Sequence, residues 1–472
     1  MGERETARSG QLKLSFIPKR EIDRIRGAPM NRFARAALLG DVFRLNTLYM
    51  IMRAGSGHIG TSFSAMDIVT WLWTEEMVNP NEFEKSEADI FFSSKGHDVP
   101  GLYSLLAGLG KIDFELIHKL RRLNGLPGHP DVGTPYIAAN SGSLGMGISK
   151  ARGMAFARRL RGERGRIYVL TGDGELQEGQ IWESLRPAVN GGYGELTVIV
   201  DSNKMQSDTW VKLVNDLGDL EARFRSSGWE VARCDGHDPR AIHGVLSRFK
   251  NIKDRPQVLI ADTVKAKGIS FMESTSFMDD EGYKFHAGAP IVGDYARGVG
   301  ELVEKINRAL GAAELAPLAV EEVEIPPRVP PEGSPERLVD AYGDELLKIA
   351  RTRKDIVVLD ADLSPDCGIG PFRKEFPERF LECGIAEQDM VSAAGGMALR
   401  GLLPVVHSFA CFLAPRPNEQ IYTNATEQTK IIYTGTLAGI VPGGPGHSHQ
   451  SVRDISVMGA MPGFTLIEPA NE

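Results

Sequence analysis

Residues 166–208, RIYVLTGDGELQEGQIWESLRPAVNGGYGELTVIVDSNKMQSD, decide the fold of this chain. The stretch predicts an apolar strand, a Gly-Asp-Gly turn, an amphipathic helix, a second apolar strand and a turn that opens with Asn203. Asp173 and Asn203 end the two strands and are 30 residues apart, about the length of one strand-helix-strand unit. Neighbouring parallel strands would bring both side chains to the same edge of a sheet.

That edge is where open α/β proteins bind ligands, because the carboxyl ends of the strands and the amino ends of the helices converge there. Oxygen ligands from Asp173 and Asn203, with a nearby backbone carbonyl, suit a Mg²⁺ ion that keeps part of its shell for water or phosphate. Gly172 and Gly174 would let the backbone approach a diphosphate closely. A bare Gly-Asp-Gly is usually an ordinary turn, but the flanking strands and the distant asparagine favour a ligand site.

Length and composition indicate a soluble globular protein. The 472 residues, of which 42% are hydrophobic, are enough for two or three domains. The net charge of −8 is spread along the chain, so we expect neither nucleic acid nor a membrane among the partners. The four cysteines form no CxxC pair, no apolar run of signal-peptide length opens the chain, and no segment is long enough to span a bilayer. We therefore expect a cytoplasmic protein.

The alternation of strands and helices predicts two α/β domains, each with a doubly wound parallel sheet. Residues 1–29 are polar and are expected to form a loose amino-terminal arm. The first domain would then occupy residues 30–311. Residues 312–335 are rich in proline and glutamate and predict a linker, and residues 336–472 would form the second domain.

Hydrophobic periodicity predicts the elements more closely. Leu38, Val42, Leu45, Tyr49 and Met52 recur at alternating spacings of four and three, which indicates a helix that begins near Asn31. Further helices are expected at 64–77, 239–249, 337–350 and 389–400, and strands at 90–94, 258–264, 356–362, 402–409 and 430–434. Residues 265–286 lack periodicity and are long for a connector, which suggests a functional loop.

Histidines gather in the predicted loops. His58, His97 and His129 each lie beside a glycine in a loop, which favours a polar ligand pocket over core packing. His58 could equally cap the end of the preceding helix. Within the loop at 265–286, His286 is the residue best suited to acid–base chemistry. Residues 140–147 form a glycine-rich loop at a helix start, which could cradle an anion or simply permit close helix packing.

Ten separated motifs together resemble the transketolases, enzymes that depend on thiamine diphosphate and Mg²⁺. In chain order they are SGHIG (56–60), SSKGHDV (93–99), GLPGHPD (125–131), GSLGMG (142–147), GDGELQEGQIWE (172–183), DSNKMQSD (201–208), HAGAP (286–290), CGIAEQDM (383–390), HSFACF (407–412) and GPGHSHQ (444–450). Such an ordered set is far more specific than any one motif. The resemblance implies two doubly wound parallel-sheet domains of the thiamine diphosphate-binding type, the first binding the diphosphate and the second the aminopyrimidine.

The resemblance also implies a set of cofactor residues. Asp173 and Asn203 would bind Mg²⁺, or Ca²⁺, through their side chains, and Met205 through its backbone carbonyl. Leu144 would support the bent cofactor from between its rings. The residues around thiamine diphosphate would be His97, Gly142, Ser143, Leu144, Gly172, Asp173, Gly174, Glu178, Asn203, Glu387, Phe409 and Phe412, with the two phenylalanines supplying the stacking surface for the pyrimidine.

Glu387 is implied to be the residue on which the chemistry depends. A carboxyl group buried against a heteroaromatic ring is costly to ionise, so it can share a proton with a ring nitrogen. In the family this contact leads to a carbanion on the cofactor, which attacks a ketose carbonyl. Taken alone, Glu387 would more simply be an acidic residue in the first turn of a helix.

The resemblance implies that four histidines are catalytic: His58, His97, His286 and His449. Moving protons on hydroxyl groups suits histidines, whose pKa lies near neutrality. Substrate contacts would come from His58, His129, His286 and His449. The implied activity is reversible transfer of a two-carbon ketol unit from a ketose phosphate to an aldose phosphate, at active sites shared between the subunits of a homodimer.

Three departures from the family pattern leave parts of this prediction open. GPGHSHQ contains an additional histidine, His447, where many relatives carry an acidic DGPTHQ-like sequence, so recognition of the donor hydroxyls is open. The segment LSPDCGIGPFRKEF does not match a common phosphate-binding form, and Arg373 and Arg416 could equally form surface salt bridges. The sequence stops at Glu472, so we expect a second domain that is incomplete at its carboxyl end, or a separate chain that completes it.

Other functions remain possible on this evidence. One is a different thiamine diphosphate-dependent ketol or acyl transfer, such as 1-deoxyxylulose-phosphate synthesis or transfer between modified sugars. Another is a non-catalytic subunit that binds the cofactor. A nicotinamide-dependent dehydrogenase is disfavoured, because no GxGxxG follows a predicted strand.

Overall fold

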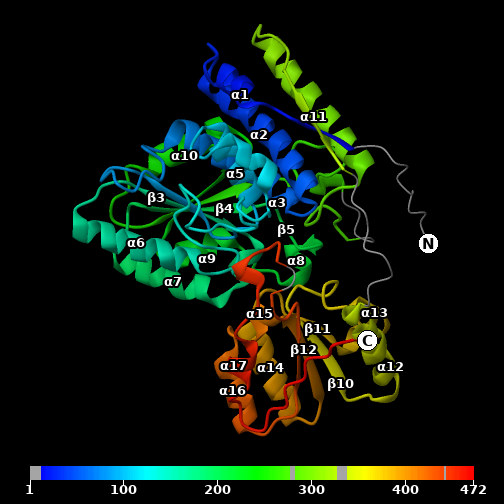
Figure 1. Cartoon of the computed structure of the whole chain (residues 1–472). Helices are drawn as coiled ribbons and strands as arrows, with labels where there is room; N and C mark the ends of the chain where they lie inside the picture. The colour runs from blue at the N-terminus through cyan, green and yellow to red at the C-terminus, as the bar shows by residue number, and fades with distance from the viewer. Residues whose placement is uncertain (1–11, 277–281, 327–336, 441–442, 472) are drawn as a thin grey trace.

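The computed structural model describes residues 12–276, 282–326, 337–440 and 443–471. Figure 1 shows two α/β units, a larger one that runs from blue to green and a smaller one that runs from yellow to red. Each unit is built around one parallel sheet. The prediction of two doubly wound domains is therefore confirmed.

The first domain contains a five-stranded sheet in which every pairing is parallel. Its strands, in spatial order, are β2 (Ile90–Ser93), β3 (Ile167–Gly172), β4 (Leu196–Ser202), β8 (Gln257–Asp262) and β7 (Glu230–Asp235). Alternate residues of β3 face opposite cores, since Tyr168 and Leu170 belong to one hydrophobic cluster and Val169 to another. Apolar strands covered on both faces are typical of parallel sheets.

The stretch from 166 to 208 folds as expected. β3 leads through the short 3₁₀ turn η3 (Gly174–Gln177) into helix α7 (Gly179–Asn190), and β4 follows beside β3. Gly172 lies opposite Asp201 in the register of the two strands. Asp173 and Asn203 therefore leave the sheet at the same edge, as the spacing predicts.

Helix α2 (Arg32–Ala54) is the central helix of the first domain. Asn31 caps it by accepting a hydrogen bond from the Phe33 amide, and Gly55 ends it with φ of 76°. Every residue from 38 to 52 is buried, because α2 packs against α4, α5 and α11 at once. The predicted helix at 64–77 is present as α4 (Met66–Trp71), continued by the π-helical turn η1 (Leu72–Glu76).

The remaining elements of the first domain surround this frame. They are α3 (Ile59–Ser64), α5 (Val99–Gly108), η2 (Phe114–Lys119), α6 (Gly147–Arg161), β5 (Met205–Gln206), β6 (Thr209–Trp210), α8 (Val211–Val214), α9 (Leu220–Ser226), α10 (Pro239–Phe249), η4 (Ser274–Ser276) and α11 (Val292–Ala312). The predicted loop at 265–286 has only η4 as regular structure, and its residues 277–281 lie outside the described part.

The prediction of a loose amino-terminal arm is wrong for residues 12–29. They form strand β1 (Leu12–Phe16) and helix α1 (Lys19–Arg26), and the side chains of Leu14, Ile22 and Ile25 are fully buried. The sparse apolar residues of this segment are enough to fix it, because each one faces the core of the first domain.

The predicted linker also contains regular structure. Strand β9 (Glu321–Ile325) pairs antiparallel with β1, so that Leu12 lies opposite Ile325. Residues 327–336 of the predicted linker lie outside the described part of the chain. The boundaries of the domains stay predictions.

The second domain contains a four-stranded parallel sheet. Its strands, in spatial order, are β11 (Phe380–Glu382), β10 (Ile356–Asp360), β12 (Leu403–Phe409) and β13 (Ile432–Thr436). The helices are α12 (Leu338–Thr352), α13 (Gly370–Glu375), η5 (Pro377–Arg379), α14 (Glu387–Leu399), α15 (Ala410–Leu413), α16 (Asn418–Thr426), η6 (His447–His449) and α17 (Asp454–Met458). β13 lies at one edge of the sheet and pairs, among the described residues, with β12.

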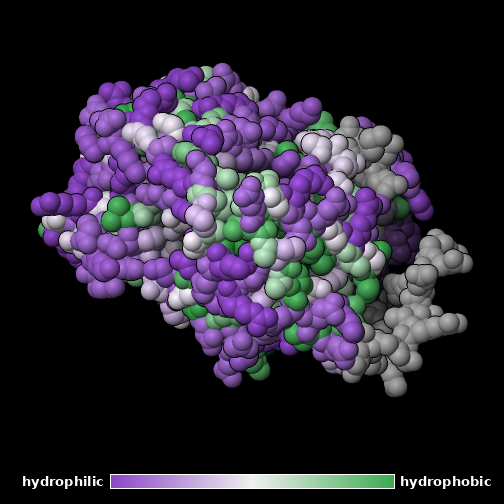
Figure 2. All heavy atoms as spheres, turned by 90° about the horizontal axis from the view of Figure 1, so that it is seen from above, coloured by the Kyte–Doolittle hydropathy of each residue, from purple (hydrophilic) through white to green (hydrophobic). Residues whose placement is uncertain are grey.

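The surface is mainly hydrophilic on the face seen in Figure 2, with hydrophobic residues gathered near its centre. None of the helices in the described ranges has the length and apolar character needed to cross a membrane.

Candidate active site

A cavity of about 520 Å³ lies between the two domains. It is bordered by the carboxyl ends of β3 and β4 from the first sheet and of β10 and β12 from the second, as open α/β sheets favour. Most of the residues singled out from the sequence line it: His58, His97, His129, Gly142, Leu144, Gly172, Asp173, Gly174, Asn203, Met205, His286, Glu387, Phe409, Phe412 and His449. Two distant parts of the chain thus form one site.

The oxygen-rich edge of the site is built around Asp173. Its carboxylate accepts hydrogen bonds from the backbone amides of Gly174 at 2.9 Å and Lys204 at 2.5 Å. Burial, together with the negative charge of Asp201, raises the pKa of Asp173 to about 7. A carboxyl group that is costly to ionise in this way gains from a cation at the same place.

Asn203 lies beside Asp173 with its side chain buried. Its Oδ1 accepts from the Met205 amide at 3.0 Å, and Met205 itself is buried in β5. Asp173, Asn203 and the Met205 carbonyl make an oxygen-only donor set of the kind that Mg²⁺ or Ca²⁺ prefers. Among the described residues no group of three or more His, Cys, Asp or Glu could hold a metal ion, so a metal held here would need the amide and the carbonyl.

Glycines shape the wall next to the oxygen-rich edge. Gly142 has φ of 112°, and a Cβ there would lie 2.7 Å from the ring of His129. A Cβ on Gly174 would lie 2.9 Å from Gln206. Side chains at these positions would collide with their neighbours, so glycine keeps the backbone exposed to the cavity. Such a wall fits a diphosphate group.

A buried ion pair supports this edge from behind. Lys95 Nζ lies 2.6 Å from Asp201 Oδ2, and both side chains are almost fully buried. Burial disfavours both charges, but each partner stabilises the other, raising the pKa of Lys95 and lowering that of Asp201. Hydroxyl groups of Ser64, Thr61 and Thr263 complete the pair's hydrogen bonds. Neither residue was singled out from the sequence, because the partners are 106 positions apart.

Lys265 is a second buried lysine, and it lines the cavity directly. Its ammonium group donates to the Ser207 carbonyl at 3.2 Å and lies 5.1 Å from the centre of the Tyr283 ring. Burial lowers its pKa to about 8, although Asp173 and Asp362 act in the opposite direction. This residue lies in the loop predicted to be functional, but nothing in the sequence distinguished it from Lys267.

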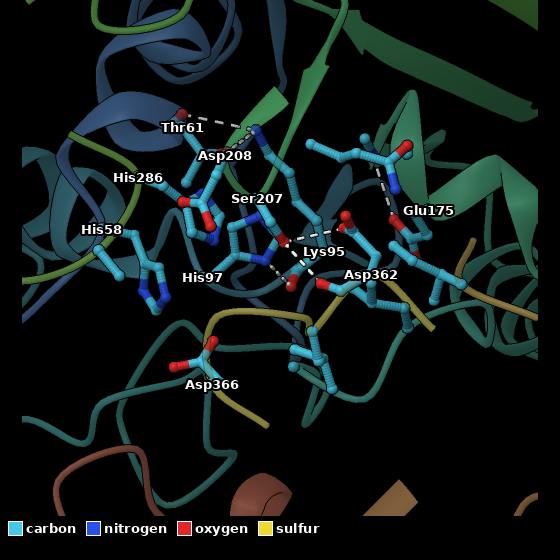
Figure 3. A pocket seen from close by; sticks show the side chains of 18 of the residues that line it. His58, Thr61, Lys95, His97, Glu175, Ser207, Asp208, His286, Asp362 and Asp366 are labelled. Carbon is cyan, nitrogen blue, oxygen red and sulfur yellow. Dashed lines mark hydrogen bonds between the residues drawn. The ribbon is translucent and has the colours of Figure 1, made fainter. Parts of the chain in front are cut away.

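Three histidines from three different loops meet on one side of the cavity, as Figure 3 shows. The ring of His58 lies 5.4 Å from that of His97 and 5.4 Å from that of His286. Burial and the neighbouring histidines hold the pKa of His58 well below its usual range, and burial does the same for His97 and His286. All three are therefore neutral near pH 7.

The hydrogen bonds of these rings indicate which nitrogen is free. The Nδ1 of His97 is 2.8 Å from the Lys95 carbonyl, which can only accept, so this nitrogen carries the proton. Its Nε2 is then the basic atom. The Nδ1 atoms of His58 and His286 are buried without a hydrogen-bond partner in the described chain. Buried polar atoms of this kind are typical of a ligand site.

His129 and His449 form a second pair, one from each domain. Their rings are stacked with centroids 4.7 Å apart, and His129 Nδ1 lies 2.7 Å from the Pro445 carbonyl. Burial lowers the pKa of His129 to about 4 and that of His449 to about 3. His447 lies outside the cavity, 3.5 Å from Asp131 and 3.4 Å from Asn140.

Glu387 opens helix α14 and reaches the first domain through Arg416. Arg416 Nη1 lies 2.6 Å from Glu387 Oε1 and 2.5 Å from Glu178 Oε1, and its Nη2 donates to Ser143 Oγ at 3.0 Å. Burial and the charge of Glu387, only partly offset by Arg416, raise the pKa of Glu178 to about 8. Ser143 and Glu178 thus border the site through Arg416.

The other oxygen of Glu387, Oε2, is buried and has no hydrogen-bond partner among the described residues. An orphaned carboxyl oxygen that lines a cavity fits a nitrogen base as its ligand. Phe409 and Phe412 lie nearby with ring centroids 5.9 Å apart. His449 is 5.3 Å from Phe412, so the aromatic wall adjoins the histidines.

The sequence left open the roles of Arg373 and Arg416, and the two residues lie in different surroundings. Arg416 lines the cavity, whereas Arg373 is exposed, forms a 4.0 Å ion pair with the largely buried Glu382 and packs over Phe380. The cavity has one further arginine, Arg121, which follows η2 and was not singled out from the sequence.

Comparison with known families places both halves of the chain. Residues 36–279 match the family described as transketolase, thiamine diphosphate binding domain. Residues 337–472 match the one described as transketolase, pyrimidine binding domain. The chain belongs to the transketolase family.

Curated relatives agree with this assignment. The chain is 31% identical over 444 residues to transketolase-like protein 2 of Mus musculus, a match that spans 91% of the chain and 69% of that relative. It is 28% identical over 443 residues to the transketolase of Homo sapiens, with the same coverage of 91% and 69%. A protein of Clostridium sp. (strain MSTE9) named 6-deoxy-6-sulfo-D-fructose transketolase subunit SqwG is 37% identical over 236 residues, 49% of this chain and 86% of that subunit.

Solved structures support the fold. The transketolase of Campylobacter jejuni superposes with a TM-score of 0.53 at 24% identity, covering 94% of this chain and 75% of the other. The transketolase fold of two doubly wound parallel-sheet domains is thereby shown for this chain.

Proposed function

We propose that this protein is a thiamine diphosphate-dependent ketol transferase that moves a two-carbon ketol unit from a ketose phosphate to an aldose phosphate. The observation that carries the proposal is the single cavity in which the oxygen-rich edge at Asp173, the orphaned carboxyl oxygen of Glu387 and five neutral histidines meet. Family membership supports the cofactor class, and the site supports the roles of individual residues.

The residues present fit the cofactor and its metal. Asp173, Asn203 and the Met205 carbonyl would hold Mg²⁺, and the backbone around Gly142 and Gly174 would border the diphosphate. Glu387 Oε2 would bind the protonated ring nitrogen, and Leu144, Phe409 and Phe412 would pack against the rings. When bound, thiamine diphosphate supplies a nucleophilic thiazolium carbon, which the protein itself lacks.

The chain's own histidines would handle protons on the sugar. Each is neutral near pH 7, so each can accept a proton at one ring nitrogen and return it. His97, whose Nδ1 proton is committed to the Lys95 carbonyl, would accept at Nε2. His58 and His286 would bind the substrate hydroxyl next to the reacting carbonyl. His129 and His449 would bind another substrate hydroxyl, beside their stacked rings.

The identity of the sugar is a separate question. A relative named for 6-deoxy-6-sulfo-D-fructose favours a second candidate, ketol transfer from a sugar that carries a sulfonate in place of a phosphate. The word subunit in that name also supports a further proposal, that a separate chain completes the active protein. We propose in addition a cytoplasmic homodimer; the family resemblance supports the dimer.

Purified full-length protein with thiamine diphosphate and Mg²⁺ tests the function. We expect chromatography to detect a shortened aldose phosphate and a lengthened acceptor when xylulose 5-phosphate and ribose 5-phosphate are supplied. Glu387→Gln should lower the rate by about 100-fold or more, because the amide cannot share its proton in the same way. Glu378→Gln, an exposed control in η5, should not change it. Absence of product from phosphorylated and sulfonated ketoses alike would exclude the proposal.

A further inference from the structure

Arg121 differs from the other charged residues of the cavity. It follows η2 with φ of 56°, a left-handed conformation that side chains other than glycine seldom adopt. Its backbone amide donates to the Leu126 carbonyl at 2.7 Å, and its Nη1 donates to Ser56 Oγ at 3.0 Å. Backbone strain of this kind gathers at ligand sites.

The remaining edge of its guanidinium group has no partner among the described residues. Nε and Nη2 are shielded from water and make no hydrogen bond within the described part of the chain. These two nitrogens present parallel N–H groups, the arrangement that grips a carboxylate, phosphate or sulfonate through two hydrogen bonds. Arg416, the other arginine of the cavity, has both Glu178 and Glu387 as partners.

Burial lowers the pKa of Arg121, and no carboxylate opposes this effect. An unpaired buried cation is costly, and an anionic ligand would offset the cost. The positive charge of Arg121 also acts on His58, His129 and His449, so the guanidinium lies on the histidine side of the cavity.

Another part of the cavity wall has the opposite character. Asp208, Asp362 and Asp366 line it, and Figure 3 shows Asp208 and Asp366 around the same opening as His58. Burial raises the pKa of each of these carboxyl groups, and Asp208 raises that of Asp366 further. These carboxyl groups, with Lys265 among them, offer a phosphate or sulfonate group no pair of parallel N–H donors.

The backbone packs closely against the Arg121 side chain. Gly128 and Gly444 flank the side chain, and a Cβ on Gly128 would lie 3.0 Å from Nε. A Cβ on Gly444 would lie 3.6 Å from Cδ. Arg121 and Pro445 both line the cavity, so an anion that reaches the guanidinium edge must displace the Gly444–Pro445 turn, which carries no side chain at Gly444.

We propose that Arg121 binds the tetrahedral oxyanion of the sugar substrate, a phosphate monoester or a sulfonate, through Nε and Nη2. This inference rests on the proposed function and specifies where the anionic end of the substrate lies. Arg121 is thus a specificity residue for the anionic group of the substrate.

Matched substrates test the proposal. The Michaelis constant is measured with fructose 6-phosphate and with fructose as donors, for the wild type, Arg121→Gln, Arg121→Lys and the neighbouring control Arg122→Gln. Arg121→Gln should raise KM for the phosphate about tenfold or more and leave KM for fructose unchanged. Arg121→Lys should recover part of the loss, since it keeps the charge but not the paired donors. Equal changes for both donors, or none, would overturn the proposal.

A binding measurement separates this proposal from the catalytic one. Inorganic phosphate and methanesulfonate should each raise the melting temperature of the wild type and of Arg122→Gln, and raise that of Arg121→Gln much less. The anion that raises the melting temperature more indicates the class of substrate. If the wild type binds these anions through Arg121 but transfers no ketol unit, the proposed function fails and the anion site stands. If it transfers ketol units without any dependence on Arg121, the anion site fails.

Discussion

Single residues set the proton balance of the cavity. The five histidines are neutral because burial lowers the pKa of each, whereas burial raises the pKa of Glu178 and Asp173. Near pH 7 the site therefore carries fewer charges than its composition suggests. Neutral groups of this kind can exchange protons with a sugar without large changes in local field.

Glu178 gives this balance a measurable consequence. Its pKa is raised from 4.5 to about 8, so the folded state holds a proton that the unfolded state has lost over that range. Stability must then fall as the pH rises from about 5 to about 8, by up to about 1.4 kcal/mol per pH unit. Glu178→Gln mimics the protonated form, so we expect a flatter dependence of melting temperature on pH between 6 and 8. Parallel curves for variant and wild type would contradict this protonation state.

At the same scale, the sequence identified motif residues better than their supports. His58, Asp173, Asn203 and Glu387, which line the cavity, were singled out because each lies in a short, recognisable segment. Lys95 was not assigned a role, since its partner Asp201 is distant in the sequence and the pair becomes visible only when β2, β3 and β4 lie in that order in the sheet. Arg121 was missed because its main property, an edge without a partner, is three-dimensional.

At the scale of elements, one buried polar network connects α2 to the rim of the cavity. Arg44 of α2 bonds to Asp67 of α4 at 2.6 Å, and Asp67 also lies 2.7 Å from His237 Nδ1. His237 Nε2 accepts from the backbone amide of Val264 at 2.8 Å. The network thereby fixes the backbone that leads directly into Lys265.

Removing the charge of Asp67 should destabilise the folded protein. Burial opposes its ionisation, but Arg44 and His237 lower its pKa, so the carboxylate is held in its charged form. We expect Asp67→Asn to reduce the free energy of unfolding by about 3 kcal/mol or more, because Arg44 is left buried without its main partner. Denaturant titration measures this. Glu345→Gln, which breaks an exposed pair with Lys348, should change stability little, and an equal effect would contradict the argument.

Sequence patterns predicted the elements where burial is strong and local. The apolar strands β3 and β4 and the helix α2 were recognised because their hydrophobic residues are dense and regular. β1 and β9 escaped recognition, because each is only five residues long, β9 is mostly glutamate, and the two are stabilised by pairing with each other across about 300 residues. Long-range pairing of this kind leaves little trace in a local pattern.

At the scale of the whole molecule, the structure assembles the site within one chain, with Arg416 of the second domain bonded to Ser143 and Glu178 of the first. The predicted homodimer would form the same contacts between subunits, and it stays a prediction. In that arrangement each cavity takes its two halves from different chains.

Mixing two inactive variants distinguishes these arrangements. Asp173→Asn damages the first half of the site and Glu387→Gln the second. If sites are shared between subunits, a mixed dimer has one site with both changes and one with none, so random reassortment should restore about a quarter of wild-type activity. Light scattering confirms the oligomeric state. Exchange of subunits without any recovery would show that each chain builds its own site, as in this structure.

The pairing of β1 with β9 has a practical consequence for hybrid proteins. The antiparallel contact from Leu12 to Ile325 ties the beginning of the chain to the segment that departs toward the second domain. A chimaera that borrows its second domain from a relative should therefore be joined after Ile325, so that the native amino terminus keeps its partner strand. Joining at the end of α11 would import a foreign β9 against a native β1, and the graft would lose the native pairing of these two strands.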